Sequence, residues 1–487
     1  MSELPPANSA NPFEFEAESM RRLGYRVVDR IVEHMLSAEQ VPPVRWNQVP
    51  GDVKPLIQPF PEAPRDPAAA VEEAIDTVFG NTTNLMHPRF FAYMPGPSNY
   101  ISALADFMAS GFNVFAGVTP HNFSAFEVER QTIDWLGAQF GWSEPSSGLF
   151  VSGGSAANFT ALAVARQVQL ENRMDGAVVY CSEQTHSSIE RAMYLLGFKP
   201  RQLRLLEPDV DLRLEAGVLQ QAVVSDLAAG LRPFCVIGNG GTTNTGTVDP
   251  LDDLADVCER HDLWFHVDAA YGGGAILSPT TRERFAGIER AHTITVDPHK
   301  WMFQPFECAC ILGREQAWFR DTFRRLPAYM RDTDAGGDSF NYRDMGLQVT
   351  RSFKAFKLWL SLQVYGVETF RTAVDRGLAL ARYAERRVRS MAAWEVVTPA
   401  TLGVLTCRYR GQGEEEDLDQ LNAGLARALN RSGFAYVTTT ELFGFTVLRL
   451  CPIHPGTTEA DIDETLRRLD AFAREDARGE TASADRS

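Results

Sequence analysis

The chain has 487 residues, of which 44% are hydrophobic and 23% are charged, so it can form a large core and two or three globular domains. Its net charge of −16 argues against nucleic acid and anionic membrane surfaces as partners, and no apolar run approaches the roughly 20 residues of a membrane span. Residues 1–10 lack the features of a signal peptide and the seven cysteines are scattered, so we expect a cytoplasmic protein with reduced thiols and no metal site.

The first hundred residues predict two helices and an arm. After a loose start over residues 1–12, apolar residues at helical spacing indicate a helix within 13–36. Prolines are frequent in 41–67 and predict an extended arm, and a second helix follows at 68–79. These helices are too few to form an independent domain. Further along, 115–126 is rich in aromatic and small residues and is expected to be a loop.

From Leu149 onward, short apolar strands alternate with amphipathic helices. This alternation predicts an α/β fold whose mostly parallel sheet has helices on both faces. A further strand at 306–312 is expected to be antiparallel and to bury the thiols of Cys308 and Cys310. The expected strands are 150–151, 177–182, 234–238, 263–268 and 293–296, and the expected helices are 159–170, 186–195 and 251–261.

A glycine turn joins the first of these strands to its helix. Gly153, Gly154 and Ser155 stand where the helix begins. Free N–H groups and the positive end of the helix dipole converge at such a point and favour an anion. Glycines are common in turns, so the motif alone is weak evidence.

Two charged residues follow neighbouring strands. Asp268 ends an apolar strand, and Lys300 stands four residues after the strand at 293–296. A desolvated lysine can attack a carbonyl, and a buried aspartate needs a cationic partner. Pyridoxal phosphate (PLP) chemistry uses both, as a Schiff-base lysine and a carboxylate on the ring nitrogen. Taken alone, such a lysine is more often a surface charge, and such an aspartate is as often a helix cap or salt-bridge partner.

Four motifs in order resemble the group II PLP-dependent decarboxylases, a family that includes the aromatic L-amino-acid decarboxylases. The resemblance runs from about Phe15 to about Phe472. The motifs are His87-Pro88-Arg89-Phe90-Phe91-Ala92-Tyr93, His186-Ser187-Ser188, His266-Val267-Asp268-Ala269-Ala270-Tyr271 and Asp297-Pro298-His299-Lys300-Trp301. The resemblance implies the type I fold of PLP enzymes, with a seven-stranded type of sheet and a small C-terminal α/β domain. It also implies a homodimer.

The resemblance also implies roles for individual residues. Lys300 would hold PLP, Asp268 would bind the ring nitrogen and His186 would stack on the ring. Tyr329, in a polar loop at 324–346, would protonate the substrate carbon, with a water ordered near His186 as the alternative proton donor. The remaining residues expected to bind the cofactor are Gly154, Ser155, Thr243, Ala270, His299 and Asp297, and those expected to bind substrate are Tyr93, Gly96, His121 and Thr350.

Three of these positions depart from the pattern of the aromatic decarboxylases. Asp297 stands where the family often has asparagine, and a carboxylate beside a phosphate repels it unless it binds donors. Gly96 stands where a hydroxyl residue lines the substrate pocket, and Thr350 replaces a small glycine. These changes concern substrate fit more than the chemistry.

The C-terminal part predicts a smaller α/β unit. A long helix is expected over 351–365, then strands at 396–397, 403–409, 435–439 and 445–451 and helices at 418–429 and 459–473. The predicted division is an N-terminal arm for dimerisation (1–98), a large PLP-binding domain (99–375), a small domain (376–475) and a disordered tail (476–487).

The expected reaction is decarboxylation of an L-amino acid to an amine and CO₂. An aromatic substrate of the tryptophan, tyrosine, phenylalanine or DOPA type is favoured over an aliphatic or imidazole one. The closest alternative reaction is that of a decarboxylation-dependent aldehyde synthase, which ranks below the decarboxylase because such relatives have lost the loop tyrosine that Tyr329 matches. An aminotransferase or another lyase on this fold, and a PLP-binding protein without activity, remain as further alternatives.

Overall fold

The computed structural model describes residues 11, 13–45, 59–94, 96–119, 122–325, 327–328, 340–411 and 415–476. The predicted loose start other than Asn11, the tail beyond Asp476, and the predicted site residues His121 and Tyr329 lie outside these ranges. Within them, no helix has both the length and the apolar character needed to cross a bilayer.

Contacts divide the chain into two compact units. One comprises residues 1–92, 409–448 and 456–487, and the other comprises 93–408 and 449–455. The predicted boundary at 375 falls inside helix α10 (Ala355–Arg389), which continues past it after a non-helical residue at Gly366. The division into arm, large domain and small domain therefore stays a prediction.

The larger unit contains a seven-stranded sheet in the order β1-β7-β6-β5-β4-β2-β3. Strands β2 to β6 run parallel, and β7 is antiparallel to both β6 and β1. This confirms the predicted fold class and the antiparallel strand near 306–312. The strands are β1 (Ser147–Val151), β2 (Ala177–Ser182), β3 (Leu203–Leu206), β4 (Arg232–Asn239), β5 (Trp264–Asp268), β6 (Thr293–Val296) and β7 (Ala309–Gly313).

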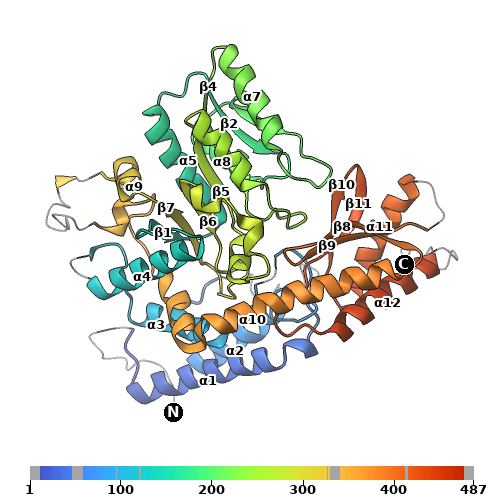
Figure 1. Cartoon of the computed structure of the whole chain (residues 1–487). Helices are drawn as coiled ribbons and strands as arrows, with labels where there is room; N and C mark the ends of the chain where they lie inside the picture. Colours follow the sequence, from blue (N-terminus) through green and yellow to red (C-terminus); the bar gives the residue numbers. More distant parts are fainter. Residues whose placement is uncertain are drawn as a thin grey trace. The chain divides into compact units, whose positions relative to one another are not determined.

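Helices cover both faces of this sheet. Figure 1 shows α5 on one side and α7 and α8 on the other, as expected for parallel strands joined by crossover helices. The helices are α3 (Tyr100–Gly111), α4 (Phe123–Gln139), α5 (Gly154–Leu170), α6 (Ser188–Leu195), α7 (Ala216–Ala228), α8 (Leu251–Arg260) and α9 (Gln316–Phe323). Strand β3 and helices α3, α4, α7 and α9 are additional to the prediction, and the loop expected over 115–126 is wrong from Phe123 onward because α4 begins there.

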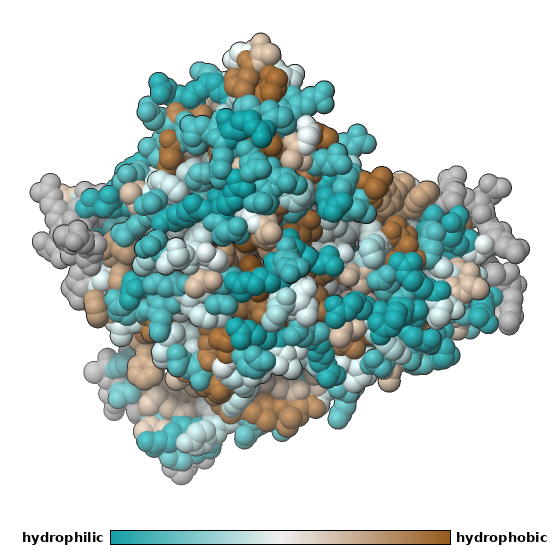
Figure 2. All heavy atoms as spheres, in the orientation of Figure 1, coloured by the Kyte–Doolittle hydropathy of each residue, from teal (hydrophilic) through white to brown (hydrophobic). Residues whose placement is uncertain are grey.

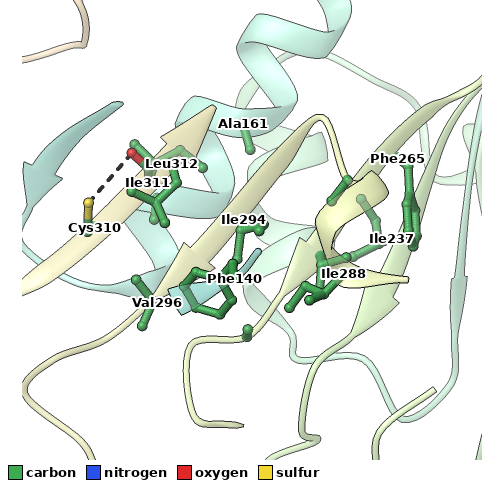
Figure 3. Packing of buried hydrophobic residues seen from close by; sticks show 14 of the residues in the cluster. Phe140, Ala161, Ile237, Phe265, Ile288, Ile294, Val296, Cys310, Ile311 and Leu312 are labelled. Atoms are coloured by element: carbon green, nitrogen blue, oxygen red, sulfur yellow. Dashed lines mark hydrogen bonds between the residues drawn. The ribbon is translucent and has the colours of Figure 1, made fainter. Parts of the chain in front are cut away.

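The sheet packs tightly against its helices. Figure 3 shows Phe140, which follows α4, beside Ile294 and Val296 of β6, and all three side chains are at most 1% exposed. The seven cysteines are free and buried, which confirms the prediction for Cys308 and Cys310. On the face drawn in Figure 2, most of the exposed residues of the sheet and its flanking helices are hydrophilic. The dense core fixes the ends of the strands, where the polar residues stand.

The other unit contains the N-terminal helices α1 (Ala17–Leu36) and α2 (Pro67–Thr77). Ion pairs between α1 and α2 include Arg30 to Asp76 at 2.7 Å. Helix α2 begins with a proline after Asp66, whose side chain accepts the N–H of Ala69, a favourable start for a helix.

The C-terminal part of the chain contains a second, four-stranded sheet in the order β10-β11-β9-β8. Phe443 and Gly444 both have positive φ and form the two-residue turn between β10 and β11. This turn places β10 three residues later than predicted. The elements are β8 (Trp394–Thr401), β9 (Val404–Tyr409), α11 (Glu415–Arg431), β10 (Thr438–Leu442), β11 (Phe445–Leu450) and α12 (Glu459–Asp476).

Candidate active site

A cavity of about 260 Å³ opens at the carboxyl ends of β4, β5 and β6, next to the start of α5. Ligands of α/β proteins bind at this edge of the sheet. All nine residues predicted to bind the cofactor line it: Gly154, Ser155, His186, Thr243, Asp268, Ala270, Asp297, His299 and Lys300. The fold therefore brings together residues that lie up to 146 positions apart in the sequence (from 154 to 300).

The start of α5 forms one wall of the cavity. Helix α5 begins at Gly154. The first backbone N–H groups of a helix have no partner within the helix. A Cβ atom at Gly154 would lie 2.9 Å from Asp297 Oδ2 and 3.1 Å from the Cβ of Ala270, so a larger residue would require Asp297 or Ala270 to shift. The glycine thus leaves the backbone N–H groups open to an anion.

Asp268 stands at the end of β5 and is only 7% exposed. Its Oδ1 accepts a hydrogen bond from the backbone N–H of Ala270 at 3.1 Å, and its Oδ2 accepts one from Asn158 Nδ2 at 2.8 Å. Both donors are neutral. A protonated pyridine nitrogen would supply the cation that a buried carboxylate needs.

Lys300 pairs with Asp297. Lys300 Nζ lies 2.9 Å from Asp297 Oδ2, and His299 Nε2 lies 3.5 Å from the same oxygen. In the part of the chain that the structure describes, the buried Oδ1 of Asp297 has no hydrogen-bond partner. Burial lowers the pKa of His299, although the Asp297 carboxylate opposes this shift. Asp297 thus orients the Lys300 amine and keeps one oxygen for a further donor.

His186 lies at the start of the segment leading into α6. Its Nδ1 is 3.2 Å from the backbone N–H of Ser188, which donates to it, and 2.9 Å from the Ser188 hydroxyl. Burial lowers the pKa of His186, opposed by the nearby Asp268 carboxylate. The ring is therefore held at one nitrogen and is mainly neutral at pH 7.

A buried arginine that sequence reasoning missed supports the loop of Thr243. Arg449 donates to the carbonyl oxygens of Thr243 and Asn244 at 2.8–3.1 Å and to that of Tyr93 at 2.6 Å. It is 4% exposed. The available signal was a charged residue within the apolar strand β11. Asn158 and Asn239, which also line the cavity, were missed because an asparagine gives little signal in sequence.

The residues predicted to bind substrate are placed differently. Tyr93 is 60% exposed, and a Cβ at Gly96 would collide with the carbonyl oxygens of His299 and Lys300. Thr350 lines a second cavity of about 790 Å³, together with Phe115. None of these three belongs to the described residues that line the first cavity, so their roles stay predictions.

The residues present fit PLP. A lysine amine, a buried carboxylate with neutral donors, an imidazole and the start of a helix converge on one cavity. These are the groups that the cofactor's aldehyde, ring nitrogen, ring face and phosphate require.

Comparisons with known proteins agree with this chemistry. Residues 50–410 match the pyridoxal-dependent decarboxylase conserved domain. An aromatic-L-amino-acid decarboxylase of Bacillus atrophaeus is 41% identical over 467 residues, covering 95% of this chain and 97% of that protein. A phenylacetaldehyde synthase of Arabidopsis thaliana is 30% identical and covers 92% of this chain and 94% of that protein.

A solved structure gives the same result for the fold. The crystal structure of Oryza sativa TDC with PLP and tryptamine has a TM-score of 0.90 and 28% identity, over 96% of this chain and 99% of that chain. The family match covers most of the sequence, and the cavity contains the residues that PLP chemistry requires. The chain therefore belongs to the pyridoxal-dependent decarboxylase family and is a PLP-dependent carbon–carbon lyase.

Proposed function

We propose that this enzyme decarboxylates an aromatic L-amino acid to the corresponding amine and CO₂, with Lys300, Asp268 and His186 as its central residues. The observation that carries the proposal is that these three residues and the start of α5 line one cavity. The names of the relatives support an aromatic substrate.

Each residue has a distinct task in this proposal. Bound PLP supplies an electron sink for the pair left behind as CO₂ departs. Lys300 would hold the cofactor through its amine, and Gly154 and Ser155 would bind the phosphate with the N–H groups at the start of α5. Asp268 would hold a proton at the ring nitrogen. His186 would cover one face of the ring and orient the substrate carboxylate, so that the bond to be broken stands perpendicular to the ring.

The remaining cofactor-binding residues support these groups. Ala270 donates its backbone N–H to Asp268, and Thr243 lies on the loop that Arg449 holds. Asp297 would orient the Lys300 amine, and His299 lies near the same Asp297 oxygen. Tyr329 would hold the proton that is delivered to the substrate carbon.

The substrate side would be completed by Tyr93, Gly96, His121 and Thr350, in a homodimer located in the cytoplasm. Because Thr350 lines a cavity other than that of Lys300, we infer that a second copy of the chain brings its substrate-binding residues to the Lys300 cavity of the first. Measuring the molar mass in solution, with and without PLP, tests the dimer.

Product analysis tests the proposed reaction. Purified enzyme loaded with PLP is offered a panel of L-amino acids while CO₂, amine, aldehyde and peroxide are followed together. Amine and CO₂ in equal amounts from one aromatic substrate would support the proposal and name the substrate. Turnover of only an aliphatic or imidazole amino acid would overturn the aromatic assignment.

The second candidate is a decarboxylation-dependent aldehyde synthase, which the 30% identity with a phenylacetaldehyde synthase favours. It would consume O₂ and water and release aldehyde, CO₂, ammonia and peroxide in the same assay. Tyr329 argues for the amine as product. We expect Tyr329→Phe to release CO₂ still but to shift product from amine towards aldehyde, and an unchanged amine yield would contradict the role of Tyr329 as proton donor.

A further inference from the structure

Asn158 lies on α5 in the wall of the cavity, and it is 1% exposed. Its Nδ2 donates to Asp268 Oδ2 at 2.8 Å and to the Ser188 hydroxyl at 2.9 Å. Its Oδ1 accepts from the Thr295 hydroxyl at 2.7 Å and lies 3.1 Å from His266 Nε2. The amide thus uses two donors and two acceptor sites.

The neighbours fix which way this amide points. The Asp268 carboxylate only accepts hydrogen bonds when ionised, so Nδ2 must face it. A flipped amide would place Oδ1 against the carboxylate oxygen at 2.8 Å and leave two buried acceptors in contact. Asn158 therefore donates to Asp268 and offers its oxygen to His266 and Thr295.

One branch of these hydrogen bonds reaches His186. The Ser188 hydroxyl accepts from Asn158, so its own proton is available to His186 Nδ1 at 2.9 Å. The backbone N–H of Ser188 also donates to this nitrogen. With Nδ1 an acceptor, the proton of neutral His186 resides on Nε2, the other ring nitrogen.

The other branch runs into the core through His266, which is fully buried. Burial lowers its pKa to about 4, so the ring is neutral at pH 7. Asn158 Oδ1 has no proton to give, so His266 carries its proton on Nε2 and donates it to Asn158. His266 Nδ1 lies 2.9 Å from the Thr293 hydroxyl and 3.2 Å from the Thr293 carbonyl oxygen, and Trp264 Nε1 donates to that hydroxyl at 3.1 Å. The donors are thus directed from the core towards Asp268.

We propose that Asn158 is a positioning residue that divides its two amide protons between Asp268 and Ser188, and thereby orients the carboxylate for the cofactor's ring nitrogen and directs the proton of the Ser188 hydroxyl towards His186 Nδ1. This inference rests on the proposed function, since it requires PLP in this cavity. The amide of Asn158 then links Asp268, which would bind the ring nitrogen of the cofactor, to His186, which would cover the face of that ring.

The test replaces Asn158 by Asp, which keeps the shape of the side chain but removes both Nδ2 protons. Two carboxyl groups 2.8 Å apart cannot both ionise, so the link to Asp268 changes in charge as well as in donors. Loss of a hydrogen bond to a charged group predicts that the Kd for PLP rises roughly 10- to 100-fold. The Kd is measured by titrating cofactor-free protein with PLP without substrate, and the visible spectrum of bound PLP is recorded alongside.

Two further variants separate the branches from general damage. Ser188→Ala cuts only the branch to His186, so we expect a wild-type Kd for PLP together with a changed KM or kcat for the substrate. Asn422→Asp is the matched control: Asn422 is fully buried and its amide binds the backbone of Tyr409 and Leu418. It should lower the melting temperature and leave the Kd for PLP unchanged.

The outcomes are distinct. If wild-type protein binds no PLP, the proposed function fails. If wild type binds PLP and Asn158→Asp binds it with the same Kd and spectrum, the positioning role is refuted, even when the melting temperature falls. Should Asn158→Asp not fold, Asn158→Ser, which is neutral and retains a single proton to donate, must still raise the Kd for PLP or change the KM for the substrate; wild-type values for both would refute the role.

Discussion

Glu129 of α4 and Arg351 form a buried ion pair that fixes the strand leading into the cofactor loop. Their side chains are 0% and 2% exposed, and Arg351 Nη2 lies 2.5 Å from Glu129 Oε1. Both also bind the same residue of β1: Glu129 accepts the N–H of Phe150 at 2.9 Å, and Arg351 donates to its carbonyl oxygen at 2.8 Å. A further bond from Arg351 reaches the carbonyl oxygen of Ala116 at 3.0 Å.

We expect Arg351→Met to destabilise the protein strongly, because it leaves the Glu129 carboxylate buried without its cation. Breaking a buried pair in this way costs roughly 3–5 kcal/mol. Adding Glu129→Gln should recover most of the loss, since a neutral glutamine can still accept the N–H of Phe150. The double variant should remain about 1–2 kcal/mol below wild type, because the carbonyl oxygens of Phe150 and Ala116 lose their donor.

Urea unfolding of cofactor-free protein measures these differences, provided that the slopes with denaturant agree between variants. Binding of PLP to the partly repaired double variant then reports whether the cofactor loop is still in place. A single variant within about 1 kcal/mol of wild type, or a double variant less stable than the single one, would refute the reasoning, because either result means that the uncompensated carboxylate is not what destabilises the protein.

Three further predictions concern the cofactor and pH. Lys300→Ala should abolish the visible absorbance of bound PLP, and a variant that keeps it would refute the assignment of the lysine. Asp297→Asn should bind PLP more tightly, because the Asp297 carboxylate lies beside Gly154 at the start of α5, where the phosphate would bind, and a carboxylate repels a phosphate. An equal or weaker affinity for PLP in titrations would contradict this. Burial lowers the pKa of His292 to about 4, so the unfolded chain binds a proton between about pH 6.5 and 4 that the folded protein does not. His292 should therefore cost stability as the pH falls through that range, and His292→Asn, compared with wild type by urea unfolding at pH 7 and pH 4.5, should lose less stability on acidification.

Much of the fold could be predicted because its signals are local. Strands β2 and β6 are apolar runs whose ends match the prediction, and Asp268 and Lys300 follow strands that share an edge of the sheet. Parallel strands deliver their carboxyl ends to the same edge, so the strand ends alone predicted that Asp268 and Lys300 lie close together. The other cofactor-binding residues were predicted from the resemblance to the family. Strand β3, whose residues are only half-buried or exposed, lacked such an apolar run.

The residues that hold these groups in place depend on tertiary structure. Asn158 contacts Asp268 and Thr295, which lie more than a hundred positions away, and Arg449 supports Thr243 across 206 positions. No periodicity or local motif distinguishes such an asparagine or arginine from one on the surface, because its partners come from other elements. The sequence by itself determined which chemical groups stand at the strand ends. Only the folded chain decided which buried donors orient them and that Tyr93, Gly96 and Thr350 stand outside the lining of their cavity, because both depend on contacts that form when distant segments pack.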